Sequence, residues 1–168
     1  MSEVKKLNLG CGDMLIPGFI NCDLYEEKAD VKCDVSKLPF EDNSIDEIYA
    51  SHIIEHFDFH EAFDVLKEWK RVLKIDGVLT IETPDLLGSC KKFIESDEQG
   101  RVNMYGHFFA RPWVPGQIHK FLYTPNQLRW TLEREGFVEI QQVSALRYIG
   151  CEDINLKMEC KKGANEGR

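Results

Sequence analysis

Three histidines and an acid lie close together in residues 51–60, which read SHIIEHFDFH. His52, Glu55 and His56 have the H-x-x-E-H spacing that one class of zinc hydrolases uses, and His60 follows four residues later. On one continuous helix the three histidines would share a face, as imidazoles do when a helix offers them to a metal ion. The first chemistry to weigh is therefore zinc-assisted hydrolysis.

The flanking pattern argues against one continuous helix through these histidines. Residues 45–50 read as a strand that ends just before His52. Asp58 with Glu61 three residues later predicts a capping box, so a helix starts there. A strand end followed by this helix start separates His60 from the other two histidines. We predict no bound metal, and zinc hydrolysis stays open as the minor alternative.

A glycine turn and two acids follow the first three predicted strands. Gly10 and Gly12 come directly after a strand at 7–9, and glycines let the backbone turn sharply and approach a ligand closely. Asp23 and Asp34 lie at the ends of the next two strands. A carboxylate at the second strand end can accept both hydroxyls of a ribose, and one at the third can accept an adenine amino group. The ordered set therefore indicates an adenosine site.

The spacing after the glycine turn argues against cofactors that contain phosphate. A dinucleotide site needs a third glycine that opens a helix, but Leu15 occupies that position. Only about six residues separate Gly12 from the second strand, which is too few for an ordinary crossover helix. No G-K-[ST] follows either, so a P-loop is excluded. S-adenosylmethionine fits what remains, because it contains adenosine but no phosphate and its positive sulfonium suits an acidic pocket.

Strand and helix patterns alternate along most of the chain. Strands are predicted at 7–9, 19–24, 30–35, 45–50, 78–82, 137–143 and 154–160, and helices at 58–73, 84–97 and 125–136. Pro84 suits the first turn of its helix, and residues 100–124 show no clear period. The alternation predicts an α/β domain with a largely parallel sheet and an antiparallel closing pair. In such sheets ligands bind beyond the carboxyl ends of the strands.

The order of these motifs resembles the class I methyltransferases that use S-adenosylmethionine, in particular the type 11 group. The resemblance covers about residues 4–142, through LNLGCGD at 7–13, NCDL at 21–24, KCDVSKLPFEDNSIDEIYASHIIEHF at 32–57 and KEWKRVLKIDGVLTIETPD at 67–85. It implies a Rossmann-like, seven-stranded, mostly parallel sheet with an antiparallel last strand. The first crossover helix is expected to be reduced or absent. It also implies methyl transfer from the sulfonium to an acceptor that the sequence does not identify.

The resemblance implies a role for each matching position. The residues implied to bind the cofactor are Gly10, Gly12, Asp23, Leu24, Asp34, Val35, Ala50, Ser51 and His52. In this scheme Asp23 binds the ribose hydroxyls, Asp34 and Val35 hold the adenine, and residues 50–52 border the methionine end. Asn8 departs from the pattern, because many members have there an acid that helps to hold the ammonium group.

The acceptor side is predicted from residue types. An oxygen or nitrogen acceptor can require removal of a proton, and a histidine near neutrality is suited to take it. His119 and His56 are the predicted catalytic residues, with His107 as a further candidate. His119 lies in a stretch at 106–125 that is either a lid over the acceptor or a packed connection between helices, and that also carries Arg111, Trp113, Lys120 and Tyr123.

Length and composition limit the remaining choices. The 168 residues predict one methyltransferase domain at 1–160 and a polar tail at 161–168. A net charge of −8 argues against a nucleic-acid partner, and no apolar run is long enough to span a membrane. Without a signal-peptide pattern, a cytoplasmic protein with reduced cysteines is expected.

The chain begins at its first strand, so we expect a large acceptor or a homo-oligomer that covers the acceptor site. A catalytically silent protein that binds S-adenosylmethionine is the other alternative.

Overall fold

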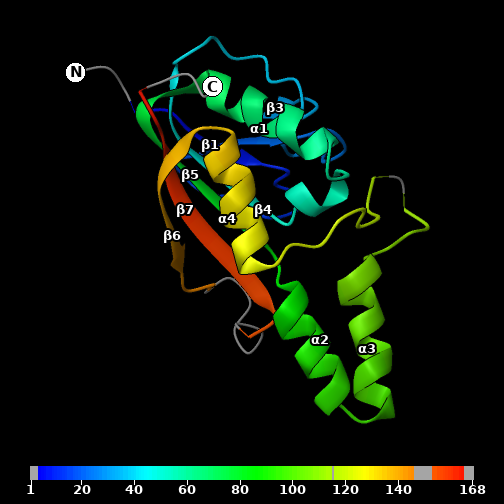
Figure 1. Ribbon diagram of the computed structural model, residues 1–168. Coiled ribbons are helices and arrows are strands. Elements are labelled where there is room, and N and C mark those ends of the chain that lie inside the picture. Colours follow the sequence, from blue (N-terminus) through cyan, green and yellow to red (C-terminus); the bar gives the residue numbers. More distant parts are fainter. Residues whose placement is uncertain (1–3, 115, 146–152, 165–168) are drawn as a thin grey trace.

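A seven-stranded sheet with the order β3-β2-β1-β4-β5-β7-β6 organises the protein (Figure 1). The computed structural model describes residues 4–114, 116–145 and 153–164. The strands are β1 (Lys6–Leu9), β2 (Ile20–Asp23), β3 (Val31–Lys32), β4 (Ile45–Ser51), β5 (Leu73–Pro84), β6 (Phe137–Val143) and β7 (Asn155–Lys162). The first five strands pair in parallel, and β7 is antiparallel to both β5 and β6. The predicted Rossmann-like α/β fold with an antiparallel last strand is confirmed.

The hydrophobic core lies on one face of the sheet. Alternate residues along the strands contribute to it, because successive side chains point to opposite faces. Two helices, α1 (Glu61–Val72) and α4 (Pro125–Arg134), pack on this face and bury Trp69 and Leu128 completely. The other face has polar pairs such as Lys6 with Glu47, whose side chains stay 37% and 30% exposed. The core therefore packs against one face of the central strands, and the carboxyl ends of these strands remain available to form a site.

No helix lies between β1 and β2, as predicted. Residues 10–19 form turns instead, and two buried amides hold them in place. Asn8 Nδ2 donates to Met14 O at 2.8 Å and to Asn21 Oδ1 at 2.9 Å, and the same Oδ1 accepts from Ile16 N at 2.8 Å. An aspartate at position 8 could not donate either bond. The Asn8 amide thus fastens the loop that connects β1 to β2 in place of a helix.

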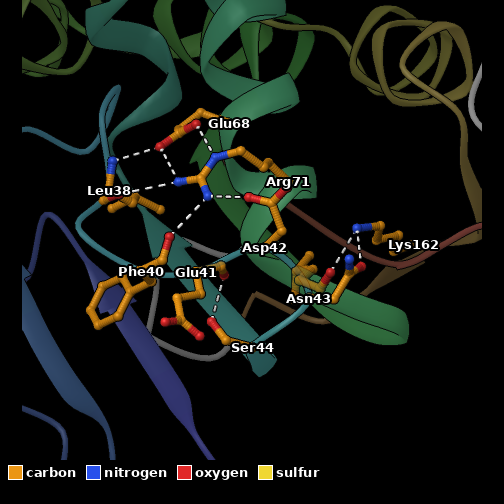
Figure 2. Close-up of polar contacts among 10 residues, drawn as sticks. Leu38, Phe40, Glu41, Asp42, Asn43, Ser44, Glu68, Arg71 and Lys162 are labelled. Carbon is orange, nitrogen blue, oxygen red and sulfur yellow. Dashed lines mark hydrogen bonds and ion pairs between the residues drawn. The ribbon is translucent and has the colours of Figure 1, made fainter.

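A network around the Arg71 guanidinium holds the long connection from β3 to β4 against α1, as Figure 2 shows. Arg71 donates to the backbone oxygens of Leu38 and Phe40, to Asp42 at 2.6 Å and to both carboxylate oxygens of Glu68 at 2.8 Å. Glu68 also accepts from Leu38 N at 2.7 Å. This network takes over the positioning that a crossover helix would supply.

Two further helices, α2 (Leu86–Glu95) and α3 (Glu98–Phe109), form a hairpin that projects from the sheet (Figure 1). Phe93 packs edge-on against Phe108 and near Tyr105 between them. No helix was assigned to residues 100–109, where the sequence shows no clear period, yet they belong to α3. Pro84 was also wrongly placed, because it ends β5, and the Asp85 side chain caps α2 by accepting from Leu87 N.

Other boundaries differ by a few residues from the expected ones. β3 is limited to two residues, and β5 begins directly after α1, five residues before the expected strand. The capping box is confirmed, since Asp58 Oδ1 accepts from Glu61 N at 2.9 Å and Glu61 Oε2 accepts from Asp58 N at 2.9 Å. Pro125 in the first turn and Thr124 as the cap of α4 are confirmed as well. β7 extends to Lys162, two residues into the expected tail, whose residues 165–168 lie outside the described ranges.

Candidate active site

A cavity of about 1170 Å³ lies beyond the carboxyl ends of β1, β2 and β4. Every residue predicted to bind the cofactor or to act in catalysis lines it, except Ala50. Ala50 is 1% exposed and its side chain belongs to the hydrophobic core. Because the strand order is β3-β2-β1-β4, the acids at the ends of β3 and β2 lie toward one end of the cavity and the residues after β4 toward the other.

The turn at Gly10 and Gly12 needs both glycines for different reasons. Gly10 has φ +61, and a Cβ there would lie 1.9 Å from Ile53 Cδ1. Gly12 has φ +48, and a Cβ there would meet no atom within 4 Å. The first glycine therefore permits close packing against the chain after β4. The second keeps bare backbone where a ligand can approach.

Asp23 organises the floor of the cavity. Its Oδ1 accepts from Tyr25 N at 2.7 Å and Glu26 N at 2.9 Å, and its Oδ2 accepts from Gly12 N at 3.0 Å. Each carboxylate oxygen offers about two acceptor positions, so Oδ2 keeps one for a ligand hydroxyl. Leu24, next along the chain, is 43% exposed and supplies an apolar contact surface. One side chain thus links the glycine turn to the strand-end loop and still faces the cavity.

Asp34 lies on the same wall as Asp23 but is less constrained. Its Oδ1 accepts from Ser36 N at 2.8 Å and Ser36 Oγ at 2.7 Å, so Oδ2 has no hydrogen-bond partner within the described chain. Val35 follows, and its carbonyl accepts from the buried Trp69 Nε1 at 2.9 Å. Asp34 is therefore held by hydrogen bonds within its own turn, and Val35 is fixed to the core through its bond from Trp69.

The chain after β4 turns into the cavity at His52. His52 has φ +56, an uncommon conformation for a residue with a Cβ, and its N–H donates to Glu82 O at 2.7 Å. Ser51 is 3% exposed, and its hydroxyl finds no partner among the described residues. A short 3-10 helix, η1 (Ile54–His56), follows and ends well before α1. The continuous helix that an H-x-x-E-H zinc peptidase motif requires is therefore absent from residues 52–60, and His60 is exposed outside the cavity.

A buried carboxylate, Glu55, joins the imidazoles around this end of the cavity. Glu55 is completely buried; its Oε1 lies 3.1 Å from His52 Nδ1 and 3.9 Å from His119 Nε2, and its Oε2 accepts from Thr83 Oγ1 at 3.0 Å. Burial raises the pKa of Glu55, but contact with His52 and the charges of His52 and His56 outweigh it and hold the pKa below its ordinary value. We infer an ionised carboxylate beneath the imidazoles.

His119 is anchored by the segment that carries it. The next two N–H groups, of Lys120 and Phe121, donate to Glu55 O at 2.8 and 3.2 Å, so this segment is tied to η1. His119 Nδ1 lies 3.1 Å from His107 O. Burial lowers the pKa of His119, and burial likewise lowers the pKa of His107, whose Nε2 lies 2.9 Å from Ile154 O. Both rings are thus favoured in the neutral form at pH 7.

The stretch at 106–125, expected as a lid or a packed connection, combines both. Residues 106–120 line one wall of the cavity through side chains that include Arg111, His119 and Lys120, with Pro115 outside the described residues. Trp113 is 79% exposed, whereas Tyr123 is fully buried in the core. The residues of this stretch that line the cavity end at Lys120, and the rest of the stretch packs toward the core.

Sequence reasoning missed Glu55 as the centre of this cluster. Within H-x-x-E-H it was read only as part of a zinc motif, and two of its neighbours, Thr83 and His119, are far away in the sequence. Cys11 and Cys33 also line the cavity. Burial raises the pKa of Cys11 to about 11, so it is a thiol at neutral pH rather than a nucleophile.

Residues 15–81 match the model of a family, the type 11 group, that is described as a methyltransferase domain. The matched segment includes Asp23, Asp34 and the chain through η1, and it begins after the glycine turn. Comparison with curated proteins finds no match. The family match bears out the predicted resemblance to the type 11 methyltransferases, over a segment that runs from the loop before β2 into β5.

Solved structures share the fold at low sequence identity. A protein from Bordetella parapertussis, described as a possible exported protein, has a TM-score of 0.65 at 15% identity, with 96% of this chain and 64% of that chain covered. A SAM-dependent methyltransferase from Archaeoglobus fulgidus has a TM-score of 0.62 at 18% identity, with 95% and 86% covered. A Haloferax volcanii protein solved with a methyltransferase activator has a TM-score of 0.62 at 14% identity, with 99% and 85% covered. The chain spans less than two thirds of the Bordetella protein.

The family match and the fold imply S-adenosylmethionine as the cofactor. The cavity fits such a molecule in two respects that come from its own atoms. Bare backbone at Gly12 leaves room for close approach, and the free acceptor positions on Asp23 and Asp34 suit hydroxyl and amino groups. None of the helices in the described parts of the chain is long and apolar enough to cross a bilayer.

Proposed function

We propose that this protein transfers a methyl group from S-adenosylmethionine to an acceptor that enters the cavity beside His119 and His56. When bound, the cofactor supplies a methyl group already activated on a sulfonium. One observation carries the proposal: a single cavity brings together the glycine turn, both strand-end acids and the imidazoles. The untested roles of the individual site residues, and the identity of the acceptor, are part of this proposal.

Different residues along the cavity bind different parts of the cofactor and the acceptor. Asp23 accepts a ribose hydroxyl through Oδ2, and Asp34 accepts the adenine amino group. Backbone at Gly10 and Gly12 lets the cofactor lie close to the sheet. Because displacement of the methyl group is in line, holding donor and acceptor in register supplies most of the rate. His119 Nε2 faces the acceptor end, where a lone pair can receive the acceptor's proton.

Cofactor binding and turnover can be tested separately. Calorimetric titration with S-adenosylmethionine and its demethylated product is expected to show one site, and absence of binding by both would overturn the proposal. Methyl-labelled cofactor is then incubated with fractionated small-molecule and protein extracts. His119→Asn is expected to keep the affinity for the demethylated product and to slow transfer by about 10²–10⁴-fold.

A matched control removes a histidine outside the cavity. His60→Asn changes an exposed ring of the same sequence motif and is expected to transfer at the wild-type rate. Binding of the cofactor with no labelled product from any fraction would favour the catalytically silent alternative over the enzyme. Zinc-dependent peptide hydrolysis would favour the other alternative.

A further inference from the structure

Three side chains at the acceptor end of the cavity form a compact set of metal-ligand types. Glu55 and His56 come from η1, and His119 comes from the segment after α3. One ligand atom from each lies within 4.8 Å of the other two. Glu55 is fully buried, the His119 side chain is 7% exposed and His56 is half-buried at the cavity wall. Two imidazoles and one carboxylate are the ligand set of many open, reactive metal centres.

Backbone carbonyls determine which nitrogen of each ring carries the hydrogen. His56 Nδ1 lies 3.0 Å from Ile118 O, and His119 Nδ1 lies 3.1 Å from His107 O. A carbonyl oxygen only accepts, so each Nδ1 must be the donor, and in the neutral ring the lone pair is on Nε2. Histidines that bind metals are usually oriented in this way, with the second nitrogen donating to a carbonyl or carboxylate.

The contact between Glu55 and His119 is longer than a hydrogen bond. His119 Nε2 and Glu55 Oε1 are 3.9 Å apart, and the nearer ring atom to Oε1 is His52 Nδ1 at 3.1 Å. A proton on Nε2 would not bridge them well, because N–H···O bonds span about 2.7–3.2 Å. A tetrahedral ion bound to both at about 2.0–2.2 Å holds its ligand atoms roughly 3.4 Å apart, so a shift of about 0.5 Å brings this pair to bonding distance.

We propose that Glu55, His56 and His119 bind one divalent transition-metal ion of the zinc type at the acceptor end of the cavity. Thr83 and His52 would hold the Glu55 carboxylate from behind, through contacts of 3.0 and 3.1 Å. These ligands differ from those of the H-x-x-E-H motif, because His52 supports the carboxylate and His119 completes the site.

The role of the ion rests on the proposed function. Three protein ligands would leave a coordination position open toward the cavity, where the ion would lower the pKa of a bound acceptor hydroxyl so that its proton passes to water. The His119 lone pair then holds the ion, and activation of the acceptor passes from the imidazole to the metal. The site therefore favours an oxygen nucleophile, such as an alcohol or an enol, as the class of acceptor.

Metal binding can be measured without any methyl acceptor. Chelator-treated full-length protein is titrated with Zn²⁺ by calorimetry and with Co²⁺ by visible absorption. We expect one ion per chain and a Co²⁺ spectrum with nitrogen and oxygen ligands. His56→Ala, His119→Ala and Glu55→Gln should each weaken binding by at least about tenfold. His60→Ala, which removes an exposed histidine of the same motif, should bind like wild type.

The outcomes separate this inference from the proposed function. Circular dichroism and binding of the demethylated cofactor are measured on every variant, so that loss of the fold is recognised. Failure of the wild-type protein to bind either ion, with the demethylated cofactor still bound, overturns the metal site and leaves methyl transfer standing. Binding that is equal in wild type, His56→Ala and His119→Ala also overturns it, as does a thiolate charge-transfer band, since the ion would then lie on cysteines.

Discussion

Replacing Asp23 tests the ribose role, and the hydrogen bonds of this carboxylate predict the size of the effect. Oδ1 already accepts two backbone N–H groups, whereas Oδ2 accepts one and keeps one position for a ribose hydroxyl. A hydrogen bond to a charged group contributes about 1.5–3 kcal/mol. Asp23→Ala should therefore weaken binding of the demethylated cofactor by roughly 10- to 150-fold, measured by calorimetry.

Asparagine at this position distinguishes the ligand contact from the support of the loop. In Asp23→Asn the amide oxygen can keep the bonds from Tyr25 and Glu26, but its NH₂ group meets Gly12 N, another donor. We expect the same order of affinity loss as for alanine, with a smaller decrease in the free energy of unfolding. Asp64→Asn is the control, because it removes a carboxylate that is 84% exposed on α1, outside the cavity, and should change affinity by less than about 0.5 kcal/mol. Wild-type affinity in Asp23→Asn would refute the ribose role.

Three further predictions concern the supports of the site. Gly10→Ala should lower the free energy of unfolding by about 2–4 kcal/mol, since it combines positive φ with overlap at Ile53; part of this loss should return in the double variant with Ile53→Ala. Arg71→Lys should cost roughly 1–3 kcal/mol in urea unfolding, because an ammonium cannot reproduce the fork that Figure 2 shows; equal stability would refute the network. The Arg71 hydrogen bond lowers the pKa of Glu68 below 4.5, so its contribution is present above that pH and is lost as the pH falls through the lowered value. The stability difference between wild type and Glu68→Gln should shrink correspondingly below pH 4.5, and a constant difference would contradict it.

Local sequence patterns predicted the parts of the site that depend on strand ends. The apolar strands and the residues that follow them, such as Gly10, Asp23 and Asp34, could be recognised because parallel strands bring their carboxyl ends to one edge. The missing first crossover helix could also be recognised, from the short distance between two strands. These features could be predicted because each depends on the spacing of residues within one short stretch of the sequence.

The rest depends on contacts between distant segments. α3 contains Gly100 and Gly106 and lacks a regular apolar stripe, so it is stabilised mainly by packing against α2, which no local pattern reports. Ala50 was expected to border the cofactor, but its side chain lies in the core, for a related reason. In a strand buried on one face, the side chain of every second residue points to the core, and Ala50 falls in the core register with Leu9 and Ile81.

The H-x-x-E-H stretch shows how the same residues acquire a different meaning in three dimensions. Its apparent zinc motif requires one helix, but the positive φ of His52 and the 3-10 turn after it break that geometry. The break directs Glu55 inward and leaves His56 at the cavity wall, and the two backbone bonds from residues 120 and 121 to Glu55 O bring His119 alongside. A buried carboxylate then faces two imidazoles whose hydrogens are held elsewhere. The feature that excludes the peptidase geometry therefore also creates the proposed metal site, at the end of the cavity that follows β4.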